Sequence, residues 1–187
     1  MNFNKHYNLE GKHAFMSASS PHWLNYTPER LKERYFTAQA AERGTIMHAF
    51  AADCIRLAQK LPKTKKTLNM YVNDAIGYKM SPEVLLYYSD YCFGTTDAIS
   101  FRDNFLRIHD YKSGVTLAKM EQLMVYAALF CLEYSINPED IGIELRIYQN
   151  NEIDICEPEP EKIRSIMNRI IEFDKIITKL KREEDAA

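Results

Sequence analysis

The chain has 187 residues, of which 46% are hydrophobic and 27% are charged, and its formal net charge is −2. This composition is typical of a soluble globular protein and excludes disordered and fibrous classes. The near-neutral charge neither indicates nor excludes a nucleic-acid partner, because such binding depends on local basic patches. The start, MNFNKHYNLEGKHAF, has no long apolar run, so we expect an intracellular protein without a signal peptide or membrane anchor.

The first third of the chain is predicted to be helical. Ser20–Pro21 and Thr27–Pro28 each have the form of an N-cap followed by proline at the first helical position, so we expect a helix to begin at each. Apolar residues recur at helical spacing after Gly44–Thr45, which predicts a separate helix there, and KLPKTKK ends it. One more helix, LNMYVNDAIGY, is expected before Ser81–Pro82.

The pattern then changes to β-structure. Residues 84–91, 93–101 and 105–112 are predicted strands separated by short turns, with a hairpin tip at 102–104. An apolar helix is expected over 118–134, a second hairpin around Asn150–Asn151, and an amphipathic helix from Pro160 to about Arg182. The order predicts an α/β protein with a mixed central sheet flanked by helices.

The length and the absence of linkers or repeats predict one domain over 1–187. Within it we expect a helical part (1–80), the strands with their crossing helix (81–157) and a C-terminal helix (158–187). The four cysteines lie far apart, without CxxC spacing and among apolar neighbours. They are therefore expected to be reduced core residues rather than a disulfide framework or a zinc site.

The third predicted strand carries charges on its apolar face. With a period of two, Asp110 and Lys112 point to the same side as Leu106 and Ile108. A buried charge persists only when a partner charge or a metal ion compensates it. Asp97, on the neighbouring strand, brings a second carboxylate to the same edge, and such a set is what a Mg²⁺ or Mn²⁺ phosphodiesterase site requires.

These residues match a known nuclease signature. Asp97 with Asp110, Tyr111 and Lys112 resembles the D…(D/E)xK pattern of the PD-(D/E)XK nuclease superfamily. RGTIMHAF (Arg43–Phe50) resembles the helical GxxxH element of its RecB-type exonuclease branch, HDYKSG matches the branch's hDxKtG form, and QLMVYAALF (Gln122–Phe130) resembles its QxxxY helix. SASSPHWLNY near the start is typical of phage members of the branch.

The resemblance implies a restriction-endonuclease-like fold and a role for each matching residue. His48, Asp97 and Asp110 would be metal ligands, together with the backbone carbonyl of Tyr111, and Lys112 would be the catalytic lysine. Lys112 could hold or deprotonate the attacking water and stabilise charge on the phosphate. Gln122 and Tyr126, four residues apart on one helical face, would steady the lysine, the water or a DNA phosphate.

The same resemblance implies a biological setting. Members of this branch cleave DNA, often from ends, with Mg²⁺ or Mn²⁺, and an imidazole ligand favours Mn²⁺. We therefore expect an exonuclease of phage or prophage DNA recombination or repair, in the cytoplasm of a bacterial or phage-infected cell. A single-strand-annealing protein is an expected partner, and a homo-oligomeric ring is a further expectation by analogy. Unlike the CRISPR-adaptation nucleases, this chain lacks the cysteine spacing for an iron–sulfur cluster, so none is expected.

Each assignment has an alternative. His48 could be a core histidine, Asp97 a turn residue, and Asp110 with Lys112 a surface ion pair. Gln122 and Tyr126 could be ordinary residues of an apolar helix. His109 points to the opposite face from Asp110 and is not expected to share the metal.

The role of the basic residues and the function of the protein also have alternative interpretations. Arg43 and the lysines of the 60–66 stretch, namely Lys60, Lys63, Lys65 and Lys66, could bind a DNA backbone or form a solvated loop. At the level of function, the alternatives are a non-catalytic DNA-binding or interaction module on the nuclease fold, and an endonuclease selective for branched or nicked DNA.

Overall fold

A computed structural model describes residues 4–9 and 11–185 of the chain. It divides into two compact units, Met1–Thr45 and Ile46–Ala187. The single domain expected over 1–187 stays a prediction, and residues 1–3, 10 and 186–187 of that range lie outside the described residues.

The first unit is helical, but not in the predicted way. The helix expected from Pro21 is a short 3₁₀ helix, η2 (Pro21–Asn25), which follows another short one, η1 (Tyr7–Leu9). The helices expected from Pro28 and after Gly44 are wrong as separate elements, because α1 (Pro28–Arg56) runs through both. The Thr27 hydroxyl caps α1 by accepting a hydrogen bond from the Arg30 N–H at 3.3 Å.

Gly44 does not end α1, although it suggested a boundary. Glycine in a helix interior costs only about 1 kcal/mol relative to alanine, so a long helix tolerates it. The Thr45 hydroxyl donates to the carbonyl of Ala41 at 3.2 Å, one turn earlier in the same helix. Both residues therefore fit inside a continuous α1.

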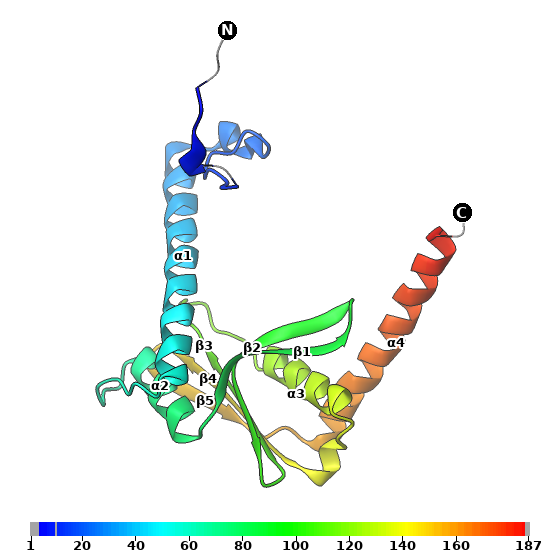
Figure 1. The fold of residues 1–187 in the computed structure, drawn as a ribbon. Coiled ribbons are helices and arrows are strands. Elements are labelled where there is room, and N and C mark those ends of the chain that lie inside the picture. Colours follow the sequence, from blue (N-terminus) through cyan, green and yellow to red (C-terminus); the bar gives the residue numbers. More distant parts are fainter. Residues whose placement is uncertain (1–3, 10, 186–187) are drawn as a thin grey trace. The chain divides into compact units, whose positions relative to one another are not determined.

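The second unit is built on a five-stranded mixed sheet, which confirms the α/β prediction at this coarse level (Figure 1). Strand order follows the chain, and only β3 and β4 are parallel. The tips of the β2–β3 and β4–β5 hairpins, Asp103–Asn104 and Asn150–Asn151, have positive φ at two successive residues, as type I′ turns require. The strands are β1 (Ser81–Ser89), β2 (Cys92–Arg102), β3 (Phe105–Tyr111), β4 (Gly142–Gln149) and β5 (Glu152–Cys156).

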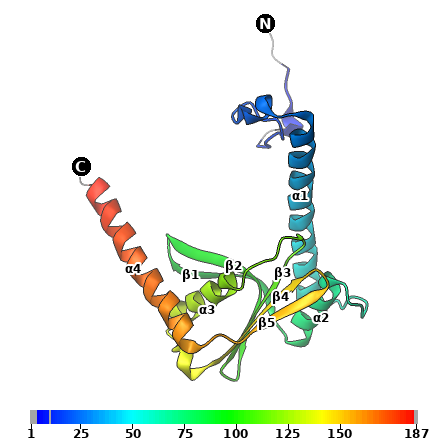
Figure 2. The same cartoon turned by 180° about the vertical axis from the view of Figure 1, so that it is seen from behind.

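Helices cover both faces of this sheet (Figure 2). On one face, Leu106 and Ile108 of β3 pack with α3 (Glu121–Glu133) and the start of α4 (Pro160–Asp185). On the other face, Tyr111 and Tyr148 pack with α2 (Thr67–Gly77) and the last turns of α1. The alternation of β3 thus separates two apolar layers, and a short 3₁₀ helix, η3 (Pro138–Asp140), leads from α3 to β4.

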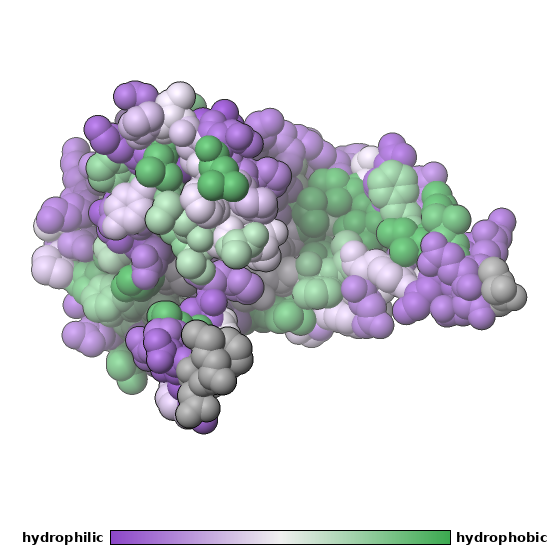
Figure 3. Space-filling view, turned by 90° about the horizontal axis from the view of Figure 1, so that it is seen from above, coloured by the Kyte–Doolittle hydropathy of each residue, from purple (hydrophilic) through white to green (hydrophobic). Residues whose placement is uncertain are grey.

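The helices of this unit differ from the predictions mainly at their ends. α3 begins at Glu121 rather than at 118, because the N–H of Ala118 bonds to the Gln149 side chain at 3.0 Å and belongs to the preceding loop. α4 continues to Asp185, and its far half exposes Phe173, Ile176 and Leu180. Figure 3 shows hydrophobic surface, in green, along this helix. Within the described residues, no helix combines the length and apolarity that crossing a membrane would need.

The cysteines occupy core or near-core positions. Cys54 and Cys131 are buried, one in each apolar layer, and Cys92 and Cys156 are half-buried against the α3 layer. All four are free thiols. They pack as small apolar residues, as predicted.

A buried tyrosine joins α2 to the sheet. The Tyr148 hydroxyl donates to Asp74 Oδ2 of α2 at 2.8 Å and lies 3.3 Å from Nδ1 of His109 on β3. Arg146 lies beside it, with a guanidinium nitrogen 3.6 Å from Asp74 Oδ2. The hydroxyl therefore joins a half-buried carboxylate of α2 to the buried imidazole of His109 on β3.

We predict that Tyr148→Phe destabilises the protein by about 1–3 kcal/mol, since it leaves Nδ1 of the buried His109 without its partner and removes the hydrogen bond to Asp74. Urea unfolding followed by circular dichroism measures the change. Tyr134→Phe, at an exposed tyrosine, is the matched control and should be neutral. Equal stabilities for wild type and Tyr148→Phe would contradict this account of the network.

Candidate active site

The site lies where β2 and β3 separate. Their backbone pairing runs from Arg102–Phe105 to Ala98–His109, while β2 continues onward paired with β1. Just beyond the last pair, the N–H of Tyr111 bonds to the side chain of Asp97, at 2.8 Å from Oδ2. Where β2 and β3 separate, which we call the fork, the Asp97 carboxylate thus accepts the hydrogen bond that a backbone carbonyl would accept between paired strands. This hydrogen bond holds Asp97 beside the end of β3.

The β1–β2 ribbon bends at the same level. Glu83 has a φ of 51° and lies between the pairs Pro82–Ala98 and Val84–Thr96. Such a backbone conformation costs about 1 kcal/mol or more for a residue other than glycine. The Glu83 carboxylate forms a salt bridge of 2.7 Å with Arg56 of α1, and both side chains are exposed.

His48 reaches Asp97 from α1. Its Nδ1 lies 3.3 Å from Asp97 Oδ1, and its ring packs against that of Tyr111, with the centroids 5.2 Å apart. The hydrogen bond to Asp97 raises the pKa of His48 above its usual value, while burial opposes the rise. With Nδ1 engaged and 32% of the side chain exposed, His48 is not a core histidine, and Nε2 is its available nitrogen.

Asp110 is a buried carboxylate paired with Lys112. The side chain of Asp110 is 3% exposed, so the pair is not a surface ion pair. Lys112 Nζ lies 3.0 Å from both carboxylate oxygens and donates to Oδ1. Oδ2 is buried and makes no hydrogen bond. Burial, and next the charge of Asp97, raise the pKa of Asp110 to about 6, although Lys112 opposes the rise.

α3 supplies a support for the lysine. Gln122 Oε1 accepts from Lys112 Nζ at 3.1 Å, and Gln122 Nε2 donates to the Tyr126 hydroxyl at 3.2 Å. The structure therefore connects both residues to Lys112, which ordinary surface positions on a helix would not require. Lys112 Nζ is held between a strand carboxylate and a helix amide.

Two residues that the sequence analysis did not single out hold this arrangement. A Cβ on Gly94 would lie 2.8 Å from Cε1 of Tyr126, so the ring packs directly on the β2 backbone. Gln149 accepts from Ala118 N and donates to the carbonyls of Gly114 and Thr116 at 2.6 and 2.8 Å, which fixes the loop after Lys112. A glycine inside a strand is a sign of such close approach, whereas nothing in the sequence marks Gln149.

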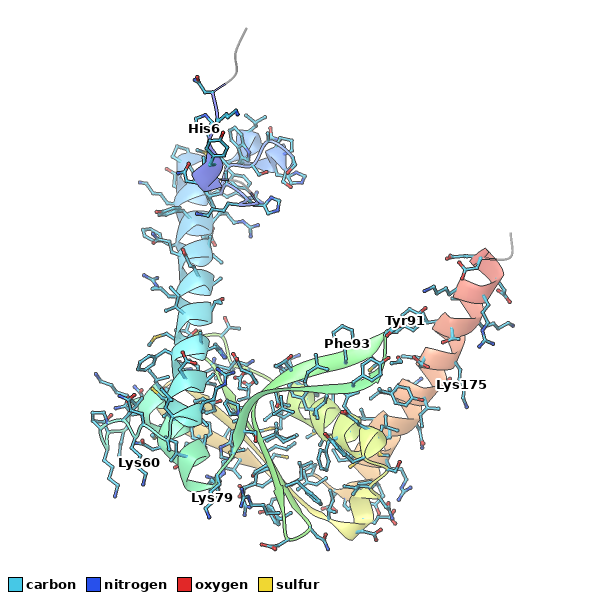
Figure 4. The ribbon with its side chains drawn as sticks, viewed as in Figure 1. His6, Lys60, Lys79, Tyr91, Phe93 and Lys175 are labelled. Atoms are coloured by element: carbon cyan, nitrogen blue, oxygen red, sulfur yellow. The ribbon has the colours of Figure 1, made fainter. Side chains whose placement is uncertain are left out.

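The remaining predictions concern basic residues, a backbone carbonyl and His109. Arg43 belongs to the unit Met1–Thr45, and Lys63, Lys65 and Lys66 are exposed in the loop that follows Lys60 (Figure 4). Their DNA binding stays a prediction, as does a ligand role for the Tyr111 carbonyl. His109 is buried in the α2 layer against Tyr148 and Tyr78, on the face opposite Asp110, as its position in the strand predicted.

Among residues 4–9 and 11–185, the structure does not gather three or more His, Cys, Asp or Glu side chains at metal-holding spacing. The candidate ligands are instead engaged in pairs, His48 with Asp97 and Asp110 with Lys112. No family model, curated protein or solved structure matches this chain. The function is therefore inferred from the residues of the site.

We predict that Gly94→Ala displaces the Tyr126 ring and destabilises the protein by about 1–3 kcal/mol, because the added methyl group has no space. Thermal unfolding measures the loss. Gly77→Ala is the matched control, since a Cβ there meets nothing within 4 Å. If the two variants unfold at the same temperature, Tyr126 does not depend on Gly94 for its position.

Proposed function

We propose that this protein is a metal-dependent DNA nuclease of the PD-(D/E)XK type. The observation that carries the proposal is the placement of Lys112 Nζ, 3.0 Å from buried Asp110 and 3.1 Å from Gln122. A buried ion pair contributes little to stability and is a candidate for a functional site, and here Asp110 Oδ2 accepts no hydrogen bond although Nζ lies 3.0 Å from it.

The fold supports the same proposal. The resemblance places both carboxylates on neighbouring antiparallel strands and the Gln–Tyr pair on the following helix. Here Asp97 lies on β2, Asp110 on β3, and Gln122 and Tyr126 on α3, the helix that crosses to parallel β4. This arrangement is compatible with a restriction-endonuclease-like core.

The residues present fit a divalent cation. Asp110 Oδ2 is a buried acceptor without a hydrogen bond, and Asp97 adds a second negative charge that raises the pKa of Asp110. Carboxylate oxygens are the ligands that Mg²⁺ and Mn²⁺ prefer, and His48 Nε2 could complete the set. When bound, the ion would act as a Lewis acid on the scissile phosphate and help to activate water.

The chain's own groups then perform the remaining tasks. Lys112 Nζ carries protons that can stabilise negative charge on the phosphate, and in its neutral form it can accept a proton from the attacking water. Gln122 fixes the direction of Nζ, and Tyr126 fixes Gln122. Asp97 orients His48 through Nδ1.

Cleavage from DNA ends is the proposed mode, with an endonuclease selective for branched or nicked DNA as the alternative. A phage or prophage recombination role, an annealing partner and a ring assembly follow only from the resemblance. The non-catalytic DNA-binding module is the weaker alternative, because it gives no reason to hold Lys112 between Asp110 and Gln122.

Cleavage of two substrates tests the proposal. End-labelled linear duplex and covalently closed circular DNA are incubated with Mg²⁺, with Mn²⁺ or with EDTA. We expect wild type to degrade linear DNA with either metal and not with EDTA. Cutting of the circle would identify an endonuclease, and no cleavage of either substrate with either metal would contradict the proposed function.

We predict that Lys112→Arg reduces the cleavage rate at least about 100-fold, since a guanidinium keeps the charge but cannot act as a base at neutral pH. Lys119→Ala, at an exposed lysine before α3, is the matched control and should cleave like wild type. Circular dichroism verifies the fold of both variants. Near-native cleavage by Lys112→Arg would exclude Lys112 as the base and leave it only the stabilisation of charge.

We predict that Asp110→Asn weakens Mn²⁺ binding at least about 10-fold, because it removes a charged oxygen ligand. Isothermal titration calorimetry with Mn²⁺ alone measures the affinity. Lys112→Ala should bind Mn²⁺ as tightly as wild type or more tightly, because it removes a neighbouring positive charge. An unchanged affinity in Asp110→Asn would show that this carboxylate is not a ligand.

A further inference from the structure

The β1–β2 hairpin has an exposed aromatic face that its packing does not explain. Phe93 is 57% exposed and Tyr87 is 44% exposed, and the two residues are register partners across the hairpin. Leu85, the next outward residue of β1, is also exposed. Figure 4 shows Phe93 on this hairpin and Tyr91 near its tip.

This face is held in place from behind. The opposite side of the hairpin packs on α3, where Leu86 is fully buried and Gly94 contacts Tyr126. The N–H of Tyr87 donates to the Glu133 carboxylate of α3 at 2.8 Å, and its hydroxyl donates to Asp90 at 2.9 Å. The aromatic face is therefore a preorganised surface and not part of the core.

The aromatic face and the candidate active site share strand β2. Phe93 and Asp97 lie four residues apart on β2. At about 3.4 Å per residue, Phe93 and Asp97 are about 13 Å apart, a distance that a few nucleotides span. A single strand of DNA whose phosphate lies at Asp97 could therefore place its neighbouring bases over Phe93.

The hairpin offers aromatic rings rather than basic side chains to a bound DNA. From Val84 to Asp97 the sequence has no Lys or Arg, and its charged residues are Asp90 and Asp97. Both forms of DNA carry phosphates that basic side chains bind, but a duplex hides its base faces, whereas a single strand exposes them to stacking on aromatic side chains. An exposed aromatic pair without basic neighbours on its own hairpin fits unpaired bases.

We propose that Tyr87 and Phe93 form a stacking platform for unpaired bases, so that the substrate is single-stranded DNA or a single-stranded end. This inference rests on the proposed nuclease function. A protein docked on the same face would cover the strand that carries Asp97 and obstruct the site, which favours the substrate as the occupant.

Binding to three oligonucleotides in EDTA, where no cleavage occurs, tests the platform. The probes are a labelled 20-nucleotide thymidine strand, the same backbone with abasic sites in place of the bases, and a blunt 20-base-pair duplex. By fluorescence anisotropy we expect wild type to bind the thymidine strand best. Phe93→Ala and Tyr87→Ala should each weaken that binding about 5- to 100-fold and leave the abasic strand unaffected.

Matched variants separate stacking from general apolar contact. Phe93→Leu keeps the apolar volume without the ring and should behave like Phe93→Ala, whereas Phe93→Tyr should bind like wild type. Tyr134→Ala, an exposed aromatic residue at the far end of α3, is the control and should change nothing. In cleavage of the thymidine strand with Mn²⁺, Phe93→Ala should raise KM and leave kcat unchanged, since Phe93 does not contact the reacting atoms.

Several outcomes would overturn the platform. These are equal affinity for the thymidine and abasic strands, unchanged binding by Phe93→Ala, or an equal loss of duplex and single-strand binding. A change of oligomeric state in Phe93→Ala without a change in DNA binding would instead identify a protein interface. If wild type cleaves DNA but Phe93→Ala keeps its KM, only the platform fails. If wild type cleaves nothing while Phe93→Ala loses thymidine binding, only the nuclease function fails.

Discussion

The buried pair of Asp110 and Lys112 is the constraint on which the rest of the second unit depends. A carboxylate that is 3% exposed needs compensation, and Lys112 supplies it at 3.0 Å. Lys112 must then be held in turn, which α3 does through Gln122. A helix in this place needs a sheet face to pack on, and Leu106 and Ile108 of the same strand provide it. β3 therefore supplies both the buried charge and part of the apolar core that supports it.

The separation of β2 from β3 explains why the charges lie together. Where two strands pair, the backbone N–H groups of one strand bond to the carbonyls of the other, so no side chain is needed as an acceptor. At the fork the Tyr111 N–H needs another acceptor, and Asp97 provides it. The bend at Glu83 turns the β1–β2 ribbon at the same level and lets the hairpin pack on α3 through Gly94 and Tyr126. One local deviation in the sheet thus positions a carboxylate, a helix contact and an exposed hairpin face.

Much of this was predictable from local patterns, and the remainder depends on contacts between distant elements. Period-two alternation placed Asp110 on the Leu106 face and His109 on the other, since a strand allows no other arrangement. The boundary expected at Gly44 was wrong, because one glycine in a helix interior costs only about 1 kcal/mol and does not end a helix by itself. Gln149 could not be found from the sequence, since its role comes from a loop more than 30 residues earlier that only the folded chain brings near it.

The contacts of the site also explain why its residues act as a group. Gly94 supports Tyr126, Tyr126 supports Gln122, and Gln122 supports Lys112, so each hydrogen bond depends on the one before. These contacts end on Asp110, whose buried carboxylate keeps its desolvation penalty unless Lys112 stays beside it, whereas Gln122 is exposed and water can replace its contacts. A protein that needed only a stable sheet would gain more from apolar residues at these positions, so their presence together is itself an argument for chemistry at this edge.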